Sequence, residues 1–280
     1  MSPADDAYGL SKRLLFCEEI IASRRPTFVL DVGCGTGENL TRPLAGRFPE
    51  VRFLGIDDDP ESIRYARAGA ALPNLSFGGY EDLAQAGSAD LIIASEVIEH
   101  VESPEEFLSD AGGHLEPGGG LIVTTPNGYG PFEFVSLIEV FLRLSGTFAL
   151  LSGFKRALVG GGTATHTRDT LATSPHISFF SHRQIRNAFA GAGFEVERYQ
   201  ARTLLCGFGL DNLVKGLAIG EWNARVADRL PPRCVSAWMF LLKKSAPRPV
   251  APYARGFIAR WRRRLNERCW GKGGTRDAER

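Results

Sequence analysis

The sequence predicts an α/β protein built on a doubly wound, mostly parallel, seven-stranded sheet, with a helical lid insertion and a basic C-terminal helix. Two observations carry this prediction. Short apolar, β-branched runs alternate with helical patterns from residue 28 to residue 125, and such alternation is typical of parallel sheets covered by helices on both faces. The first run, residues 28–32, leads directly into the glycine-rich segment GCGTG, which indicates a buried strand that enters a tight turn.

The predicted elements follow one another in chain order. Residues 10–24 form a helix because their apolar side chains recur at helical spacing, and Pro26 ends it. A second helix is expected from about Glu38. Further strands are predicted at residues 51–56, 75–77, 90–94 and 121–125, with helices at residues 61–70, 96–100 and 104–115. Later in the chain, a helix at residues 181–192 and strands at residues 194–201 and 234–242 complete the sheet.

The alternation stops at Pro126, where a long excursion begins. Two apolar helical stretches, from residues 132 and 147, precede a glycine- and threonine-rich segment. A connection of this length in a compact domain is usually a lid or a substrate-binding insert. We therefore expect one large domain over residues 1–245, which contains the lid or substrate insertion at 127–175, followed by a basic tail over residues 246–280.

Charge is distributed unevenly along the 280 residues. The chain carries 33 Lys or Arg and 32 Asp or Glu, yet residues 243–280 hold twelve Lys or Arg and only three Asp or Glu. A basic tail on an acidic body suggests contact with an anionic surface. In residues 253–270 arginines interleave with aromatic and aliphatic side chains. This segment is predicted either to lie on an anionic membrane surface or to form a solvated, loosely docked terminal helix.

Several classes of protein are excluded by what the sequence lacks. No uninterrupted run of about 18 apolar residues is present, so no conventional membrane span is expected. The acidic N-terminus has no apolar core and is not predicted to be a secretory signal. The five cysteines form no CxxC pair, which excludes a cysteine zinc site and favours reduced thiols. A cytoplasmic location, with membrane association left open, is the simplest expectation.

The segment from Asp31 to Gly37 carries the strongest chemical signal. Glycines directly after a strand let a ligand approach the backbone, and the helix that follows offers free N–H groups. The spacing of GCGTG differs from the GxGxxG of dinucleotide sites, and no Walker lysine follows. Asp57, at the end of the second strand, can accept two ribose hydroxyls. With Asp31 nearby, the crevice suits a cationic ligand better than a pyrophosphate.

Four motifs then occur in a familiar order. VLDVGCGTG, GID, ASEVIEHV and LEPGGGLIVTTPN resemble the class I S-adenosylmethionine-dependent methyltransferases, which have a Rossmann-like fold; the resemblance is strong over residues 26–126 and looser over 176–245. It implies that S-adenosylmethionine is the cofactor. It also implies a role for each matching residue: a cradle for methionine at Asp31, Gly33, Cys34 and Gly35, a ribose ligand at Asp57, adenine neighbours at Asp58, Glu81 and Asp82, and a sulfonium neighbour at Ser95.

The EVIEH segment suggests a second site. Its spacing predicts that Glu96, Glu99 and His100 share one face at a helix start, where they can bind a divalent metal. With His176 beyond the insertion, the pattern resembles ubiquinone-pathway catechol O-methyltransferases and small-RNA 2′-O-methyltransferases. Two alternatives stay open. Glu96, Glu99, His100 and His176 hold Mg or Zn, or His176 or His100 acts as general base without metal and EVIEH otherwise supports packing.

The function expected from these motifs is O-methylation of a small-molecule or lipid-like hydroxyl, such as a quinol, phenol or sugar. Asn127 either borders the acceptor pocket or forms an Asx turn. Small-RNA 2′-O-methylation is the first alternative; the basic tail favours it, but the acidic body and the lack of an RNA-binding module oppose it, so a nucleic-acid partner is not expected. A non-catalytic cofactor-binding scaffold is the second alternative.

Overall fold

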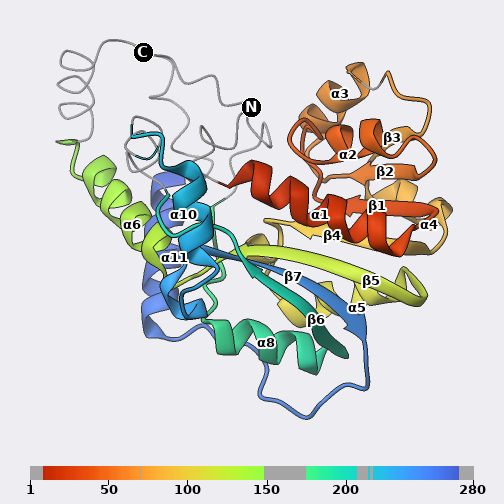
Figure 1. Cartoon of the computed structure of the whole chain (residues 1–280). Helices are drawn as coiled ribbons and strands as arrows, with labels where there is room; N and C mark the ends of the chain where they lie inside the picture. The colour runs from red at the N-terminus through yellow and green to blue at the C-terminus, as the bar shows by residue number, and fades with distance from the viewer. Residues whose placement is uncertain (1–8, 70, 148–174, 207–213, 215–216, 271–280) are drawn as a thin grey trace.

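A computed structural model describes residues 9–69, 71–147, 175–206, 214 and 217–270. Its centre is a seven-stranded sheet in the order β3-β2-β1-β4-β5-β7-β6, with helices on both sides (Figure 1). The predicted fold class is confirmed. The strands are β1 (Phe28–Val32), β2 (Arg52–Ile56), β3 (Leu75–Gly78), β4 (Ala89–Ser95), β5 (Leu115–Pro126), β6 (Phe194–Ala201) and β7 (Ala237–Lys244).

Only β7 runs opposite to the other six strands of the sheet. β1 pairs in parallel with β2 and with β4, so that Leu30 lies between Leu54 and Ile92. β7 runs antiparallel to both β5 and β6. The chain leaves β1 toward β2 and β3 and then returns to the other side of β1 with β4. The carboxyl ends of β1 and β4 therefore form the switch point at which open parallel sheets bind their ligands.

Alternation along β1 explains the two cores. Phe28, Leu30 and Val32 pack into the core on one face of the sheet, whereas Val29 packs on the other face with Phe16 and Ile20 of α1 (Leu10–Arg24). All five residues of β1 are buried. A strand buried on both faces reads as a continuous apolar run, which is the pattern that predicted it.

Helices α3 (Pro60–Ala68), α5 (Pro104–Gly113) and α8 (His182–Gly191) lie close to their predicted positions, whereas α4 and α10 were not predicted. Asp59 caps the N-terminus of α3, and Ser181 forms a capping box with Gln184 at the start of α8. The helix expected from Glu38 begins later, at Thr41, and β5 begins earlier, at Leu115. The elements are α2 (Thr41–Arg47), α3 (Pro60–Ala68), α4 (Leu83–Ala86), α5 (Pro104–Gly113), α6 (Pro131–Leu144), α8 (His182–Gly191), α10 (Gly220–Ala227) and α11 (Phe257–Trp270), with short 3₁₀ turns η2 (Tyr80–Asp82), η3 (Ile98–His100) and η4 (Pro232–Cys234).

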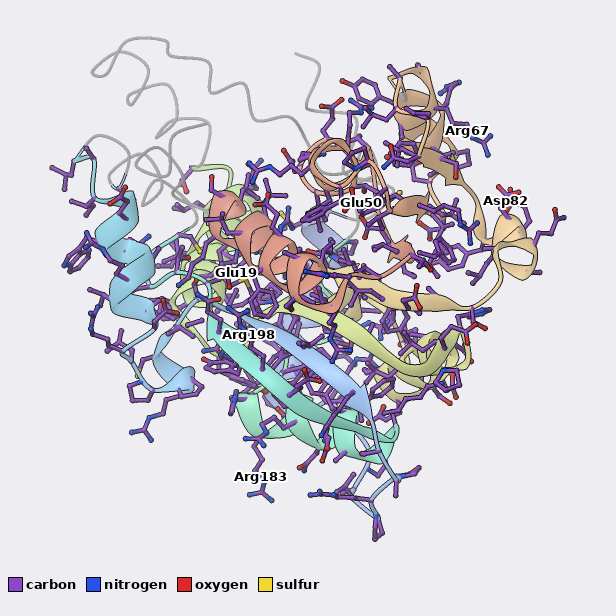
Figure 2. The ribbon with its side chains drawn as sticks, turned by 45° about the vertical axis from the view of Figure 1, so that its right-hand side comes forward. Glu19, Glu50, Arg67, Asp82, Arg183 and Arg198 are labelled. Carbon is purple, nitrogen blue, oxygen red and sulfur yellow. The ribbon has the colours of Figure 1, made fainter. Side chains whose placement is uncertain are left out.

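Ion pairs join segments that are distant in sequence. Figure 2 shows Arg198 of β6 next to Glu19 of α1, and the two side chains form an ion pair. Arg67 of α3 likewise lies 3.4 Å from Asp82 of η2. Both pairs are partly or wholly exposed, so each contributes at most about 1 kcal/mol to stability. The first pair places α1 next to β6, and the second places α3 next to η2.

The described parts of the predicted insertion and tail lie next to each other. α6 confirms the first helical stretch of the insertion, while the second stretch and the threonine-rich segment, residues 148–174, lie outside the described residues. α11 packs beside α6 (Figure 1). The tail therefore contains a helix that contacts the body of the protein. Within the described ranges, no helix has both the length and the apolar character needed to cross a bilayer.

Candidate active site

The glycine loop after β1 adopts a conformation that requires glycine. Gly33, Gly35 and Gly37 all have positive φ angles, of 71°, 55° and 69°. A Cβ atom on Gly33 would lie 2.4 Å from Cγ2 of Val97, and one on Gly37 would lie 2.5 Å from Cζ of Phe77. The N–H groups of Gly33 and Cys34 donate to the carbonyl of Ile56. These hydrogen bonds hold the loop against the end of β2, in a backbone conformation that glycine adopts readily.

Asp57 fixes this loop from the end of β2. Its Oδ2 accepts the Gly35 N–H at 2.7 Å and its Oδ1 accepts the Asp59 N–H at 2.9 Å. Partial burial raises the pKa of Asp57, although these two N–H donors oppose the shift. Each carboxylate oxygen has a second lone pair. Asp57 can therefore organise the loop and still accept two hydroxyl groups of a ligand.

The buried Asp31 performs a different task from Asp57. Its side chain accepts a hydrogen bond from Oγ1 of Thr41 at 2.6 Å. Asp31 is only 2% exposed. This bond ties the end of β1 to the first residue of α2, so Asp31 anchors the loop, and its carboxylate lends negative charge to the crevice.

The other predicted cofactor residues surround the same edge of the sheet. Asp58 is exposed directly after Asp57, and Glu81 is exposed in η2. Asp82 Oδ2 accepts the N–H of Gly79 at 3.1 Å. Ser95, at the end of β4, lies 2.9 Å from Oγ1 of Thr124. Their roles toward adenine and sulfonium remain predictions.

Glu96 corrects the prediction for EVIEH. Its φ is +58°, a left-handed conformation that lies outside the right-handed helix, and the 3₁₀ turn begins only at Ile98. Its carboxylate accepts a hydrogen bond from Thr124 at 2.7 Å and pairs with Arg202 at 3.1 Å. Burial opposes ionisation, but Arg202 and Arg13 lower the pKa of Glu96. Glu96 therefore does not share one helix face with Glu99 and His100.

Glu99, His100 and His176 do come together. One potential ligand atom from each lies within 4.8 Å of the others. Ile177 and Ser178 donate their N–H groups to the carbonyl of Glu99, at 3.0 and 2.9 Å, and so bring His176 to η3. The His100 and His176 rings meet edge to face, with centroids 4.9 Å apart. Glu96 lies outside this cluster, which the sequence had assigned as a four-residue set.

Glu133 was missed as a functional residue. Its carboxylate is 3% exposed, and Oε1 lies 2.7 Å from Nδ1 of His176. The Nδ1 of His100 lies 3.1 Å from the carbonyl of Pro175. Each imidazole thus uses Nδ1 on an oxygen and keeps Nε2 for another partner. A charged residue inside the apolar stripe of α6 was the sequence signal that could have revealed Glu133.

The pKa values of the three clustered groups are shifted in different directions. Burial, reinforced by the negative charge of Glu96, raises the pKa of Glu99 to about 8. Burial and the charge of His176 lower the pKa of His100 to about 4. Burial alone would lower the pKa of His176, but the Glu133 carboxylate outweighs it and raises that pKa to about 9. Shifts of opposite sign in neighbouring groups are typical of sites that handle protons.

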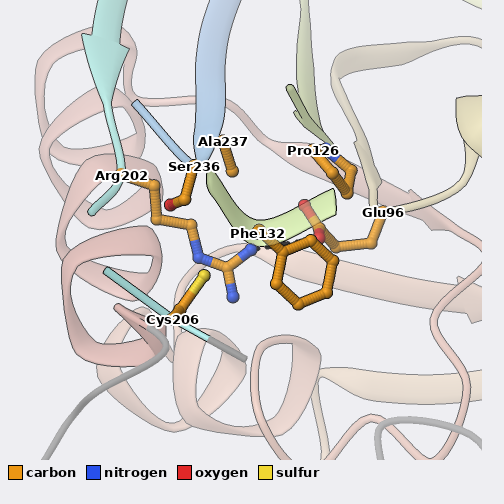
Figure 3. A pocket seen from close by; sticks show the side chains of 7 residues that line it. All are labelled: Glu96, Pro126, Phe132, Arg202, Cys206, Ser236 and Ala237. Atoms are coloured by element: carbon orange, nitrogen blue, oxygen red, sulfur yellow. Dashed lines mark ion pairs between the residues drawn. The ribbon is translucent and has the colours of Figure 1, made fainter. Parts of the chain in front are cut away.

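A small cavity of about 50 Å³ lies beside this cluster. Figure 3 shows the guanidinium of Arg202 directed toward the side of the cavity where Glu96 and Phe132 lie, with Cys206 next to it. The ring of Phe132 is 6.4 Å from that of His176. Phe132 therefore lines the cavity and neighbours His176, although His176 itself does not line the cavity. Its lining combines apolar and polar groups: Pro126, Phe132 and Ala237 with Glu96, Arg202, Cys206 and Ser236.

Asn127 settles one alternative from the sequence. Its Oδ1 accepts the N–H of Tyr129 at 3.2 Å, and its Nδ2 donates to the carbonyls of Arg233 and Val235. The side chain is 2% exposed. Asn127 therefore forms an Asx turn that links β5 to η4 and does not line the cavity.

A family model described as "Methyltransferase domain" matches residues 5–199. The chain belongs to this family. It is a class I S-adenosylmethionine-dependent methyltransferase by family, as the glycine motif predicted. In fold, this methyltransferase is similar to the plantazolicin methyltransferase BpumL in complex with a monoazolic desmethylPZN analog and SAH, with a TM-score of 0.52 and 15% identity over 87% of this chain and 88% of that one.

Curated relatives match a little over a third of this chain. The trans-aconitate 2-methyltransferase of Deinococcus radiodurans is 38% identical over 112 residues, which are 39% of this chain and 42% of that protein. The ubiquinone biosynthesis O-methyltransferase of Rickettsia felis is 33% identical over 100 residues, 35% of this chain and 41% of that protein. This methyltransferase thus spans about two fifths of the length of these relatives.

The site residues of this methyltransferase fit the cofactor of its family. The glycine loop has a backbone shape that a Cβ at Gly33 or Gly37 would disrupt by collision with Val97 or Phe77, and Asp57 keeps acceptor capacity for ribose hydroxyls. The second site also has room for a ligand atom. Oε1 of Glu99 is buried and makes no hydrogen bond within the described part of the chain. One carboxylate and two imidazoles form a donor set that suits a divalent ion such as zinc.

Proposed function

We propose that this methyltransferase methylates the hydroxyl of a small-molecule or lipid-like acceptor, with a phenol or quinol as the best match. The observation that supports this most is the Glu99–His100–His176 cluster beside the cavity at the carboxyl edge of the sheet. The apolar wall of Pro126, Phe132 and Ala237 suits a planar or aliphatic acceptor. The acceptor hydroxyl would then reach the buried groups behind Phe132.

The residues of the cluster would remove the proton from the acceptor hydroxyl. S-adenosylmethionine, when bound, would supply the methyl group: a bond from the acceptor oxygen to the methyl carbon forms as the bond from that carbon to sulfur breaks, and the sulfur leaves as a neutral thioether. Nε2 of His176 takes the proton that the hydroxyl loses, and Glu133 stabilises the imidazolium that results, because its carboxylate lies 2.7 Å from Nδ1. Glu99, which has a buried oxygen without a described partner, accepts or donates a hydrogen bond to the acceptor. Catalysis otherwise comes from holding donor and acceptor close.

A divalent metal on the same residues is part of this proposal. Glu99 and the Nε2 atoms of His100 and His176 would be its ligands, and the contacts of Nδ1 with Glu133 and Pro175 would orient the rings. Such an ion would lower the pKa of the acceptor hydroxyl. Glu96, engaged by Arg202 and Thr124, would remain outside the first set of ligands.

Two measurements test the proposed function. Calorimetry with S-adenosylmethionine should give saturable binding; no heat and no thermal shift would favour the scaffold alternative. Transfer of labelled methyl groups should then favour catechols or quinols over aromatic carboxylic acids of similar size and over a short RNA. Preferential labelling of the carboxylates or of the RNA would overturn the choice of a hydroxyl acceptor.

Chelation separates the two chemical routes. If the cluster holds a metal, EDTA should abolish turnover and added Zn²⁺ or Mg²⁺ should restore it, while the affinity for S-adenosylmethionine stays unchanged. Undiminished turnover in EDTA would contradict the metal and leave His176 as the general base. Glu99→Gln supplies the matching variant, because it keeps the size of the side chain and removes the carboxylate that would bind the metal.

We also propose that the outer face of α11 contacts an anionic membrane surface. Phe257, Ile258 and Trp261 are 78%, 58% and 40% exposed. Arg260, Arg264 and Arg268 are exposed on the same helix. Apolar and basic side chains on one exposed face suit an anionic lipid surface. In a flotation assay the protein should float with anionic vesicles, and the double variant Phe257→Ser, Trp261→Ser should stay at the bottom of the gradient. An equal floating fraction for both proteins would contradict this contact.

A further inference from the structure

The inner face of α11 contacts the segment that carries His176. Asn266 donates a hydrogen bond from Nδ2 to the carbonyl of His176 at 3.2 Å. Arg255, just before the helix, donates to the carbonyl of Ile177 at 3.0 Å and to Oγ of Ser178 at 3.0 Å. The hydroxyl of Tyr253 bonds both the N–H and the carbonyl of Phe179. Residues 176–179 are thus held, one after another, by the C-terminal segment.

Arg262 reaches furthest into the protein. It is only 7% exposed. Its guanidinium donates to the carbonyl of Gly128 and forms an ion pair with Oε2 of Glu133. It also lies 4.1 Å from the centre of the Phe179 ring. An arginine buried in this way is neither a solvated charge nor part of an outward-facing basic surface.

Glu133 links this arginine to the site. Oε2 is bound by Arg262, and Oε1 lies 2.7 Å from Nδ1 of His176. Both oxygens of the carboxylate are therefore engaged, and the carboxylate has one orientation. Because Glu133 holds Nδ1, Nε2 is the ring nitrogen that remains for other partners, and His176 belongs to the cluster with Glu99 and His100.

We propose that α11 is part of the active site, and that Arg262 and Glu133 are positioning residues that fix the ring of His176 for methyl transfer. This inference rests on the proposed function of His176. Without Arg262, Glu133 would keep only His176 as a partner, and its buried Oε2 would lose the group that binds it, which is strongly disfavoured. Glu133 would then turn away or bind a proton, and His176 would lose the acceptor that orients Nδ1.

The first variant is Arg262→Gln, with Arg264→Gln as its matched control. Arg264 is exposed on the same helix. Loss of an outer partner of an active imidazole typically costs about 10–100-fold in activity. We expect kcat on a soluble acceptor to fall by this factor in R262Q, with little change in KM or in affinity for S-adenosylmethionine. R264Q should behave as the parent. Arg262→Lys should recover part of kcat, because it restores the charge.

A double-variant cycle shows whether Arg262 acts through Glu133. Glu133→Gln preserves the size of the side chain and removes its charge. If the two residues act in series on His176, the R262Q/E133Q chain should be no slower than the slower single variant. Multiplicative losses in the double variant would overturn the proposed linkage.

Nuclear magnetic resonance of the histidine ring supplies a readout besides turnover. In the parent, the Nδ1–H proton of His176 should appear as a slowly exchanging, downfield signal, and R262Q should weaken or shift it, whereas R264Q should not. An unchanged signal and unchanged kcat in R262Q would overturn the inference. If no acceptor hydroxyl is methylated by the parent, the ring signal still tests the positioning of His176, so failure of the proposed function remains distinguishable. A general loss of folding would appear as lost affinity for S-adenosylmethionine, and E133Q then repeats the test without removing a residue of α11.

Discussion

The cofactor region and the acceptor region of this methyltransferase are assembled in different ways. The cofactor region consists of the glycine loop and Asp57, which lie close together in sequence and are joined by backbone hydrogen bonds. The acceptor region brings Glu99, Glu133, His176 and Arg262 together from four separate segments. A site made from residues that are close together in sequence can be recognised from sequence, whereas one made from distant side chains depends on how the elements pack.

The largest expected effect would separate these regions most clearly. His176→Ala should lower turnover by about 10²–10⁴-fold, because general base catalysis contributes that much. Affinity for S-adenosylmethionine, measured by calorimetry, should not change. His114→Ala, at the end of α5, is the control. If H176A also lost the cofactor, the two regions would not be independent.

A smaller effect is expected from the cofactor region. Asp57→Ala should weaken the binding of S-adenosylmethionine by about 1–3 kcal/mol, because ribose hydroxyls and the Gly35 N–H would lose their acceptor. The same substitution should leave the ring signal of His176 unchanged. Asp58→Ala, next to it and exposed, should have a lesser effect. Equal losses for both variants would contradict the ribose role of Asp57.

The pH dependence should sharpen the contrast further. The pKa of His176 is raised to about 9 by Glu133, so the neutral, proton-accepting ring becomes more abundant as pH rises toward that value. In EDTA, kcat should therefore increase by up to about tenfold per pH unit between pH 7 and 9. Cofactor affinity should change only on the acid side, where Asp57, with its raised pKa, binds a proton. A flat turnover profile would count against His176 as the base.

Local signals predicted the conformation of the glycine loop. The three glycines of the loop were expected to make a tight turn, and all have positive φ. The turn needs a backbone conformation that only glycine adopts readily, so the presence of glycine at these positions predicts the turn. The strands were predictable for a similar reason, because burial on both faces of β1 leaves a continuous apolar run in the sequence.

The acceptor region was only partly predictable. Glu99, His100 and His176 were expected together, but the left-handed turn at Glu96 cannot be read from EVIEH, where the spacing suggested a helix. Glu133 and Arg262 each interrupt an apolar stripe, which marks them as unusual but does not identify a partner. Their pairing depends on the packing of α11 against α6, a contact between segments separated by more than a hundred residues.

The position of Arg262 beyond β7, the last strand of the sheet, has a consequence during protein synthesis. A ribosome completes the glycine loop and every strand of the sheet before it adds the arginine that holds Glu133. A nascent chain that has emerged as far as β7 would already be able to capture its methyl donor but would lack an ordered histidine. Premature stop codons beyond β7 should therefore yield a product that sequesters the donor without consuming it.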